Sequence, residues 1–399
     1  MNEWNTYRVK DVAKFISEKA NDCSLPYIAL DNIVSWDGYY IPSDSTSDGN
    51  SNVCRKGDVL FGKLRPYLAK GYIPTQDSIC SPEFIVLRPN DLINNSFLLY
   101  YLLSCSFVSY IKNQVAGVKM PRTNALQIGR VSFALPPIEE QELIVSYLDK
   151  ECDKITKEID LLERKVDCYS RLRRSLINRI VTQGLNQMAP LKSSGLPWIE
   201  FIPEHWNIKR GKSILKEVYR NVRPEDGIVT CFRDGEVTLR VNRRTTGFTE
   251  SEKEIGYHGV RVGDLVVHQM DAFAGAIGIS DSDGKCSPIC IVCRPLNEDE
   301  TDIRYYCRVM AYSGFIQSLA KGIRERTTDF RYKTLEILHL PVPPYVEQQQ
   351  IVTYLDEKCS KIDSIIEKIK LKIERLKELK RSLINEVVTG QRTIKTSDL

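Results

Sequence analysis

The sequence predicts an α+β protein built from two tandem copies of one plan, in which a domain of short strands and helices is followed by a long helix. Three observations support this fold class. Blocks of similar sequence recur about 206 residues apart, short apolar runs are bounded by Gly and Pro turns, and each copy ends in apolar residues at heptad spacing.

The duplication is visible in blocks that keep their order. Residues 80–89 read CSPEFIVLRP and residues 286–295 read CSPICIVCRP, an offset of 206. Residues 147–155 read YLDKECDKI and residues 354–362 read YLDEKCSKI, an offset of 207, and SLIN recurs with the same offset at 175–178 and 382–385. Because the offset changes only from 206 to 207, aligning the two halves needs only small gaps, and we interpret the chain as a tandem repeat of a domain plus a helix.

Within each copy, the domain comes first. Short apolar runs such as 84–87 and 289–293 are bounded by turns, which predicts an irregular α+β or mostly-β domain. The long helices begin after the proline pairs at 136–137 and 343–344, where proline is well tolerated. The predicted division is a first domain at 1–137, a first helical region at 138–190, a second domain at 191–344 and a second helical region at 345–399.

The long helices carry an apolar seam with steps of three and four residues, typical of a coiled coil. Its core positions are Ile155, Ile159, Leu162 and Val166 in the first helix and Ile362, Ile366, Ile369 and Ile373 in the second. We expect the two seams to pack against each other, and spacing alone leaves parallel and antiparallel packing open. Two heptad positions further along the seam hold a cation where an apolar residue is expected. They are Arg173 in the first helix and Lys380 in the second. They either fix the register or extend their charges to solvent near a frayed helix end, and we favour the second interpretation.

Composition narrows the class of protein. The net charge of the 399 residues is only +4, so any contact with nucleic acid must come from local basic patches. Residues 2–10 are polar and charged rather than a signal peptide, and 12 cysteines without an export signal indicate reduced thiols, so we expect a cytoplasmic protein. The uncharged stretch 92–111 is interpreted as a core helix rather than a membrane span, and we expect no membrane association.

Three motifs, two of them duplicated and one at the junction of the halves, carry a family resemblance over essentially the whole chain. Residues 135–149 read LPPIEEQELIVSYLD and residues 343–356 read PPYVEQQQIVTYLD. The junction of the halves reads GLPWIEFIPEHWNIKR at 195–210, and the helices end in SLINRIVTQG (175–184) and SLINEVVTG (382–390). In this order the motifs resemble the specificity subunits of type I restriction-modification systems. The first half departs from the pattern, because it starts at Trp4 without the PWI lead-in of the second half.

The resemblance implies that each domain is a target-recognition domain, joined to the other by two long helices that form an antiparallel coiled coil. Each domain would read one half of a bipartite asymmetric site in double-stranded DNA. The helices would set the spacing and recruit two methyltransferase (M) subunits, with motor and nuclease (R) subunits in the full complex. S-adenosylmethionine, ATP and Mg²⁺ are then expected on those partners and no cofactor on this chain. The heptad stretch 155–180 spans about 39 Å at 1.5 Å per residue, close to one turn of B-DNA.

The candidate DNA-binding residues lie where the two domains differ most. In the first domain they are Lys63, Arg65, Tyr67 and Lys70 in one short loop and Lys119, Arg122 and Asn124 in another. In the second domain the matching loop supplies Gln269 and Asp271, and a basic segment supplies Arg324, Arg326 and Arg331. Arg and Lys can pair with guanine or phosphate, Gln with adenine and Asp with the amino group of cytosine. For any single Lys or Arg here, a solvated surface charge is an equally good interpretation.

Catalytic and metal motifs are weak in this chain. Cys286, Cys290 and Cys293 have the spacing of a radical-SAM iron–sulfur motif, but the repeat aligns the last two with Phe84 and Leu87, so buried strand thiols explain them better. Residues 342–345 read VPPY, which is similar to the (Asn/Asp)-Pro-Pro-Tyr motif of adenine methyltransferases. Val342 replaces the Asn or Asp that this motif needs to accept a hydrogen bond from the adenine amino group. We therefore expect no catalytic residue and no metal site. The rival hypotheses are a stand-alone methyltransferase or nuclease, and a scaffold whose domains bind peptides.

Overall fold

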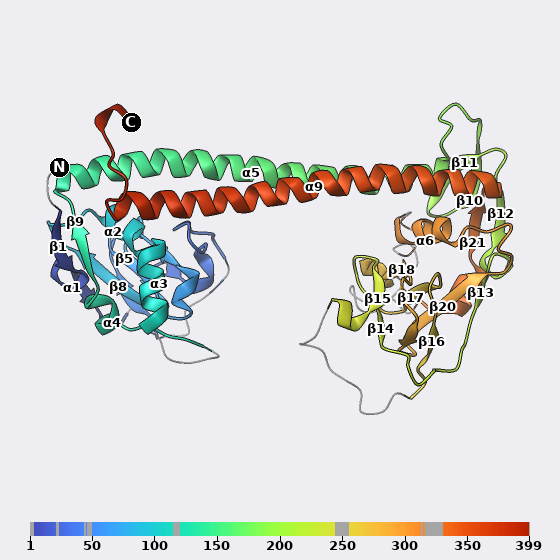
Figure 1. Ribbon diagram of the computed structural model, residues 1–399, viewed down its shortest axis with the longest axis horizontal. Coiled ribbons are helices and arrows are strands. Elements are labelled where there is room, and N and C mark those ends of the chain that lie inside the picture. Colours follow the sequence, from blue (N-terminus) through green and yellow to red (C-terminus); the bar gives the residue numbers. More distant parts are fainter. Residues whose placement is uncertain are drawn as a thin grey trace. The chain divides into compact units, whose positions relative to one another are not determined.

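The computed structural model describes residues 4–20, 24–43, 45, 50–114, 120–243, 255–312, 314, 316 and 330–398. The chain divides into two compact units. Unit 1 comprises Met1–Arg164 and Ile369–Leu399, and unit 2 comprises Lys165–Lys368. Each unit therefore contains one mixed domain, called head 1 or head 2 below, and a stretch of both long helices, α5 (Ile138–Gln183) and α9 (Tyr345–Val388) (Figure 1).

Head 1 consists of short strands followed by a group of helices. Its elements in chain order are β1 (Asn5–Arg8), α1 (Val9–Val12), β2 (Ala13–Ile16), β3 (Tyr27–Ile28), η1 (Leu30–Asn32), β4 (Asn52–Cys54), β5 (Val59–Gly62), η2 (Pro66–Leu68), β6 (Gly71–Tyr72), β7 (Ser78–Cys80), β8 (Phe84–Pro89), α2 (Asn95–Leu102), α3 (Cys105–Gln114), α4 (Ala125–Gly129) and β9 (Ser132–Leu135). The strands form a four-stranded sheet ordered β2-β8-β5-β6, a three-stranded sheet ordered β3-β7-β4, and the pair β1-β9.

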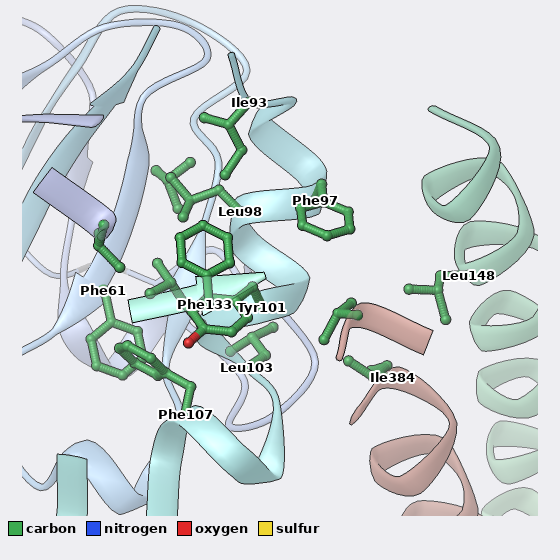
Figure 2. Close-up of a cluster of buried hydrophobic side chains, with 14 of the residues drawn as sticks. Phe61, Ile93, Phe97, Leu98, Tyr101, Leu103, Phe107, Phe133, Leu148 and Ile384 are labelled. Atoms are coloured by element: carbon green, nitrogen blue, oxygen red, sulfur yellow. The ribbon is translucent and has the colours of Figure 1, made fainter. Parts of the chain in front are cut away.

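The core of head 1 lies between its four-stranded sheet and helices α2 and α3, and it continues onto the long helices. All four residues of β5 are buried, and Phe61 makes an edge-to-face contact with Phe107 of α3 at 5.5 Å between ring centroids. Figure 2 shows that Leu148 of α5 and Ile384 of α9 belong to the same cluster of buried side chains. Because apolar burial is the main favourable term in folding, head 1 and the helix ends of unit 1 form one structural unit.

Head 2 repeats this plan with additional strands. Its elements are β10 (Leu191–Leu196), β11 (Ile199–Pro203), β12 (Asn207–Arg210), η3 (Gly211–Ser213), β13 (Leu215–Glu217), β14 (Val229–Cys231), β15 (Val237–Leu239), η4 (Arg240–Asn242), β16 (His258–Val260), β17 (Leu265–His268), η5 (Ala272–Ala274), β18 (Ile277–Ile279), β19 (Gly284–Cys286), β20 (Cys290–Pro295), α6 (Ile303–Tyr312), α8 (Tyr332–Ile337) and β21 (His339–Val342). The final short helix, η6 (Thr396–Asp398), follows α9 in unit 1. The main sheet of head 2, β13-β20-β17-β18, has the same order as β2-β8-β5-β6. Strands β17 and β20 lie 206 residues after β5 and β8, as the repeat predicts.

The helix pair is antiparallel, as the family resemblance implied. In unit 1 the beginning of α5 packs with the end of α9, and in unit 2 the end of α5 packs with the beginning of α9. The seam residues alternate with exposed neighbours, as a coiled coil requires. Ile155, Leu162, Ile362, Ile366 and Ile373 are buried, and Ile159, Val166 and Ile369 are partly buried.

One glutamine in each unit fastens the head to its helix. Gln141 is fully buried near the start of α5. Its side chain accepts a hydrogen bond from Asn94 N at 2.8 Å and donates to Leu92 O at 2.9 Å and Pro136 O at 2.8 Å. Gln348, 207 residues later, accepts from Asp302 N at 2.9 Å and donates to Glu300 O at 3.1 Å and Pro343 O at 2.9 Å. The PPxxxQ part of the motif is therefore a structural joint, in which one side chain satisfies three backbone groups.

Two expectations need correction, and one is confirmed. The stretch 92–111 forms two helices, α2 and α3, separated at Leu103 and Ser104, rather than one core helix. The interpretation of Lys380 as a charge that reaches solvent is wrong, because this residue is only 6% exposed and is paired with Asp37. Arg173 is likewise held, by Asp363 at 3.0 Å. Cys286, Cys290 and Cys293 are buried on strands, as expected.

Candidate nucleic-acid interface

The first candidate loop, residues 63–70, connects the central strand β5 of head 1 to the edge strand β6. Gly62 N donates to Lys70 O at 2.8 Å, which closes the loop at its base, and η2 begins with proline at its first position. Arg65 and Ala69, on either side of η2, have positive φ angles of 49° and 45°. Non-glycine residues adopt this conformation rarely, so the surrounding hydrogen bonds must hold the loop in its shape.

The second candidate segment, residues 120–124, lies directly on this loop. Arg65 N donates to Pro121 O at 2.8 Å, Thr123 N donates to Lys63 O at 3.0 Å, and Leu64 and Arg122 form an isolated β-bridge. The structure therefore brings together two groups of candidate residues that are more than 50 positions apart in the sequence. Lys119 falls outside the described residues.

The candidate side chains of head 1 divide into exposed and internally bonded ones. Arg65 is exposed, Tyr67 is 38% exposed, and Arg122 is exposed while it pairs with Glu83 at 3.0 Å. In contrast, Lys63 Nζ donates to Pro82 O at 2.7 Å, and burial lowers its pKa. Lys70 Nζ donates to Leu30 O at 2.9 Å. The side chain of Asn124 accepts from Gln127 N at 2.9 Å and caps the N-terminus of α4.

Head 2 places its matching loop, residues 269–276, between β17 and β18. Gln269 Nε2 donates to Pro288 O at 3.4 Å, and Asp271 pairs with Arg233 of the β14–β15 turn at 2.9 Å. Phe330 N donates to Gln269 O at 3.3 Å, and the exposed Arg331 follows it at the start of α8. Arg324 and Arg326 fall outside the described residues.

The two loops have equivalent backbone contacts but different chemistry. Lys63 and Gln269 are 206 residues apart, and each donates to the carbonyl of a proline at the same offset, Pro82 or Pro288. Sequence reasoning missed this shared internal role, although the repeat offset contained the signal. It also missed Arg233, whose side chain is 69% exposed beside Asp271.

In chemical terms the two surfaces offer hydrogen-bond donors and acceptors rather than reactive groups. The exposed guanidinium groups of Arg65 and Arg122 can bind phosphate oxygens or guanine edges. Among the described residues, no group of three His, Cys, Asp or Glu side chains is placed to hold a metal ion. No helix in that part of the chain combines the length and the apolar character needed to cross a membrane.

Comparison with known proteins gives one consistent result. Residues 1–164 match the family described as "Type I restriction modification DNA specificity domain". The type I restriction enzyme MjaVIII specificity subunit of Methanocaldococcus jannaschii is 21% identical over 98% of this chain and 94% of its own length. The EcoDI specificity subunit of Escherichia coli is 25% identical over 42% of this chain, a match that spans 38% of that protein.

A solved structure shares the fold over nearly the full length. It comes from work on complex assembly and conformational transition of a type I R-M system, and it has a TM-score of 0.71 at 18% identity, covering 98% of this chain and 99% of the other. At this identity the likeness establishes the fold alone. The family match over residues 1–164 and the related sequences both indicate similarity to the specificity subunits of type I restriction-modification systems.

Proposed function

We propose that head 1 and head 2 each read one half of a bipartite asymmetric DNA site, while the helix pair sets the distance between the halves. One observation carries the proposal: the same loop position in the same sheet is occupied by residues 63–70 in head 1 and by residues 269–276 in head 2, with different side chains. Two domains that share the same sheet but carry different side chains on this loop can bind different DNA sequences. As a specificity subunit, the chain is a non-catalytic component of its complex.

In head 1, Arg65 and Arg122 are the primary contacts that we propose. Both are exposed, and the loops that carry them are joined through Arg65 N and Pro121 O. A guanidinium group can donate two parallel hydrogen bonds to guanine O6 and N7, or bind a phosphate oxygen. Tyr67 lies on the same loop and can contact a sugar or a base. Lys63, Lys70 and Asn124 act mainly by shaping the loops, since their side chains already have partners within the head.

In head 2, the corresponding contacts come from the Asp271–Arg233 pair. The pair exposes a donor and an acceptor side by side, so Arg233 can bind guanine or phosphate while Asp271 accepts from the amino group of cytosine. Gln269 lies on the same loop, where its Nε2 donates to Pro288 O at 3.4 Å, and an amide side chain of this kind can pair with an adenine edge. Arg331, together with Arg324 and Arg326, supplies the positive charge of this head in the proposal.

The helix pair and its partners complete the proposal. We place the target-recognition domains at 1–137 and 191–344 and the helical regions at 138–190 and 345–399. Two M subunits would dock on the helical regions, and R subunits would join in the full complex. These partners would carry S-adenosylmethionine, ATP and Mg²⁺, so this chain would contribute recognition and geometry alone.

The decisive experiment is a methylome. The chain is expressed with its neighbouring M subunit in a host that lacks adenine methylation, and modified adenines are mapped by single-molecule sequencing. A split asymmetric motif that disappears when this chain is omitted is the expected result. Methylation that persists without the chain, or none in the presence of an active M subunit, would reject the proposed function. Binding of S-adenosylmethionine by the purified chain would favour the methyltransferase alternative instead.

A further inference from the structure

One loop of head 1, residues 34–41, is joined to the helix pair by polar contacts. Residues 34–41 of head 1 face α5 and α9 across a groove of about 730 Å³. Asp37 pairs with Lys380 of α9, and the hydroxyl of Tyr39 donates to Asp153 of α5 at 2.9 Å. Both contacts lie inside unit 1.

Lys380 is the central residue of this contact. Its ammonium group also donates to Thr156 Oγ1 of α5 at 2.9 Å and lies 5.5 Å from the centre of the Tyr39 ring. Only 7% of its side chain is exposed, compared with 57% for Lys372, two turns earlier in α9. Placing an ammonium group in such a buried position is costly unless it is fully paired, so a residue of this kind needs a specific role.

The neighbouring residues extend the contact. Arg381 lies over the ring of Trp36 at 4.7 Å, and Trp36 adopts a positive φ of 68°. Burial and the hydrogen bond to Asp153 raise the pKa of Tyr39 to about 12, which keeps its hydroxyl a donor at neutral pH. The short loop therefore has a fixed shape with three separate contacts to the helices.

The same loop is bonded to the candidate DNA-contacting loop. Trp36 N donates to Ala69 O at 3.0 Å, and Ala69 is the positive-φ residue that closes η2. A continuous set of contacts thus runs from Lys380 through Asp37 and Trp36 to the loop that carries Arg65. Unit 2 contains a related arrangement, because Arg173, the repeat equivalent of Lys380, pairs with Asp363 and donates to Tyr312 Oη at 3.0 Å.

We propose that Lys380 is a positioning residue for target recognition, which fixes the orientation of head 1 and its DNA-contacting loop on the helix pair. It touches no DNA in this proposal. It determines how strictly the complex selects the number of base pairs between the two half-sites. The inference rests on the proposed function, since it presumes that head 1 reads one half of a split site.

The test uses the full chain assembled with its M subunits and a plasmid library. The library carries the two half-sites found by the methylome, separated by the native spacer or by one or two base pairs more or fewer. Lys380→Met keeps an unbranched side chain that is one heavy atom shorter, and it removes the charge. Because a charge-assisted hydrogen bond contributes a factor of about ten or more, we expect the preference for the native spacer over its neighbours to fall about tenfold. The base preference at both half-sites should not change.

Matched variants separate positioning from stability. Lys372→Met removes a lysine of the same helix that pairs with Glu158 of α5 at 2.7 Å, and it should keep the wild-type spacer profile. Lys380→Arg should restore most of the selectivity. If Lys380→Met does not assemble, Asp37→Asn provides the test, because it weakens the same contact from the head side.

The outcomes distinguish this inference from the proposed function. A wild-type complex that methylates no split motif would reject the function itself. A wild-type complex that selects its spacer, with assembled Lys380→Met and Asp37→Asn complexes that select it equally well, would overturn the role of Lys380 alone. Relaxed spacer selection in the Lys372→Met control as well would also overturn it, since any lost cross-helix ion pair would then have the same effect.

Discussion

Replacing Gln141 by leucine should destabilise unit 1 and leave unit 2 intact. The substitution places an apolar side chain of similar size in a fully buried site, but it removes the partners of Asn94 N, Leu92 O and Pro136 O. An unsatisfied buried polar group costs about 1–3 kcal/mol, so three of them cost about 3–9 kcal/mol in total. Two of the three hydrogen bonds are only partly buried, and the added apolar surface offsets about 1–2 kcal/mol. We therefore expect a net loss of about 3–5 kcal/mol.

Amide hydrogen exchange followed by mass spectrometry is the appropriate assay, because it reports on each of the two compact units by itself and does not require a single free energy of unfolding for the chain. In the Gln141→Leu chain, peptides from β9 and α2 should lose protection by this amount, while peptides from β21 and α6 keep theirs. Gln348→Leu should produce the reverse pattern. The exposed Gln350 in α9 supplies the matched control as Gln350→Leu, with no expected loss. A loss below about 1 kcal/mol, or equal losses in both units, would refute the reasoning.

Three further predictions concern DNA binding and pH. Arg65→Ala should change methylation at one half-site of the motif only, and an equal loss at both would contradict two separate readers. Arg122→Ala should lower affinity, and if Arg122 binds a phosphate, the slope of log K against log salt should become shallower by about one unit, as measured by titrations at several salt concentrations. All four histidines of the chain lie in unit 2, and burial lowers the pKa of His258 and of His268. The stability that these groups contribute is present above about pH 6.5 and is lost as the pH falls, so acidification to about pH 5 should weaken unit 2 selectively. His258→Gln should reduce that pH dependence in hydrogen exchange, and equal acid sensitivity of unit 1 would count against the explanation.

The parts of the fold that the sequence predicts are those encoded by periodicity or repetition. The seam from Ile155 to Val166 follows from spacing, because side chains three and four positions apart share one face of a helix. The common plan of the heads follows from the offset of about 206 residues. The stretch 92–111 illustrates the limit of this reasoning. Its apolar residues indicate burial, but they do not reveal the break at Leu103 that turns the chain from α2 into α3.

The candidate site was only partly predictable, because its side chains depend on distant partners. Arg65 and Arg122 come together through backbone bonds between segments that no local pattern links. Lys63 looks like a surface cation in the sequence, but its partner is the carbonyl of Pro82. Lys380 is the clearest case, since Asp37 lies 343 residues away in the chain. A charge in a heptad seam therefore indicates a special position without indicating what satisfies it.

The way the loops are built explains how two heads with one fold can differ in specificity. The loop of head 1 is closed by Gly62 N and Lys70 O, and that of head 2 by His268 N and Ala276 O at 3.0 Å. Backbone groups form these bonds whatever the side chains are, so Arg65 can correspond to Asp271 without a change in the sheet. The positions of Lys63 and Gln269 require only a side chain that is long enough to donate a hydrogen bond to the proline carbonyl. Divergence is thus least costly at the exposed positions, where a change alters what the loop can bind and leaves the joint between head and helix untouched.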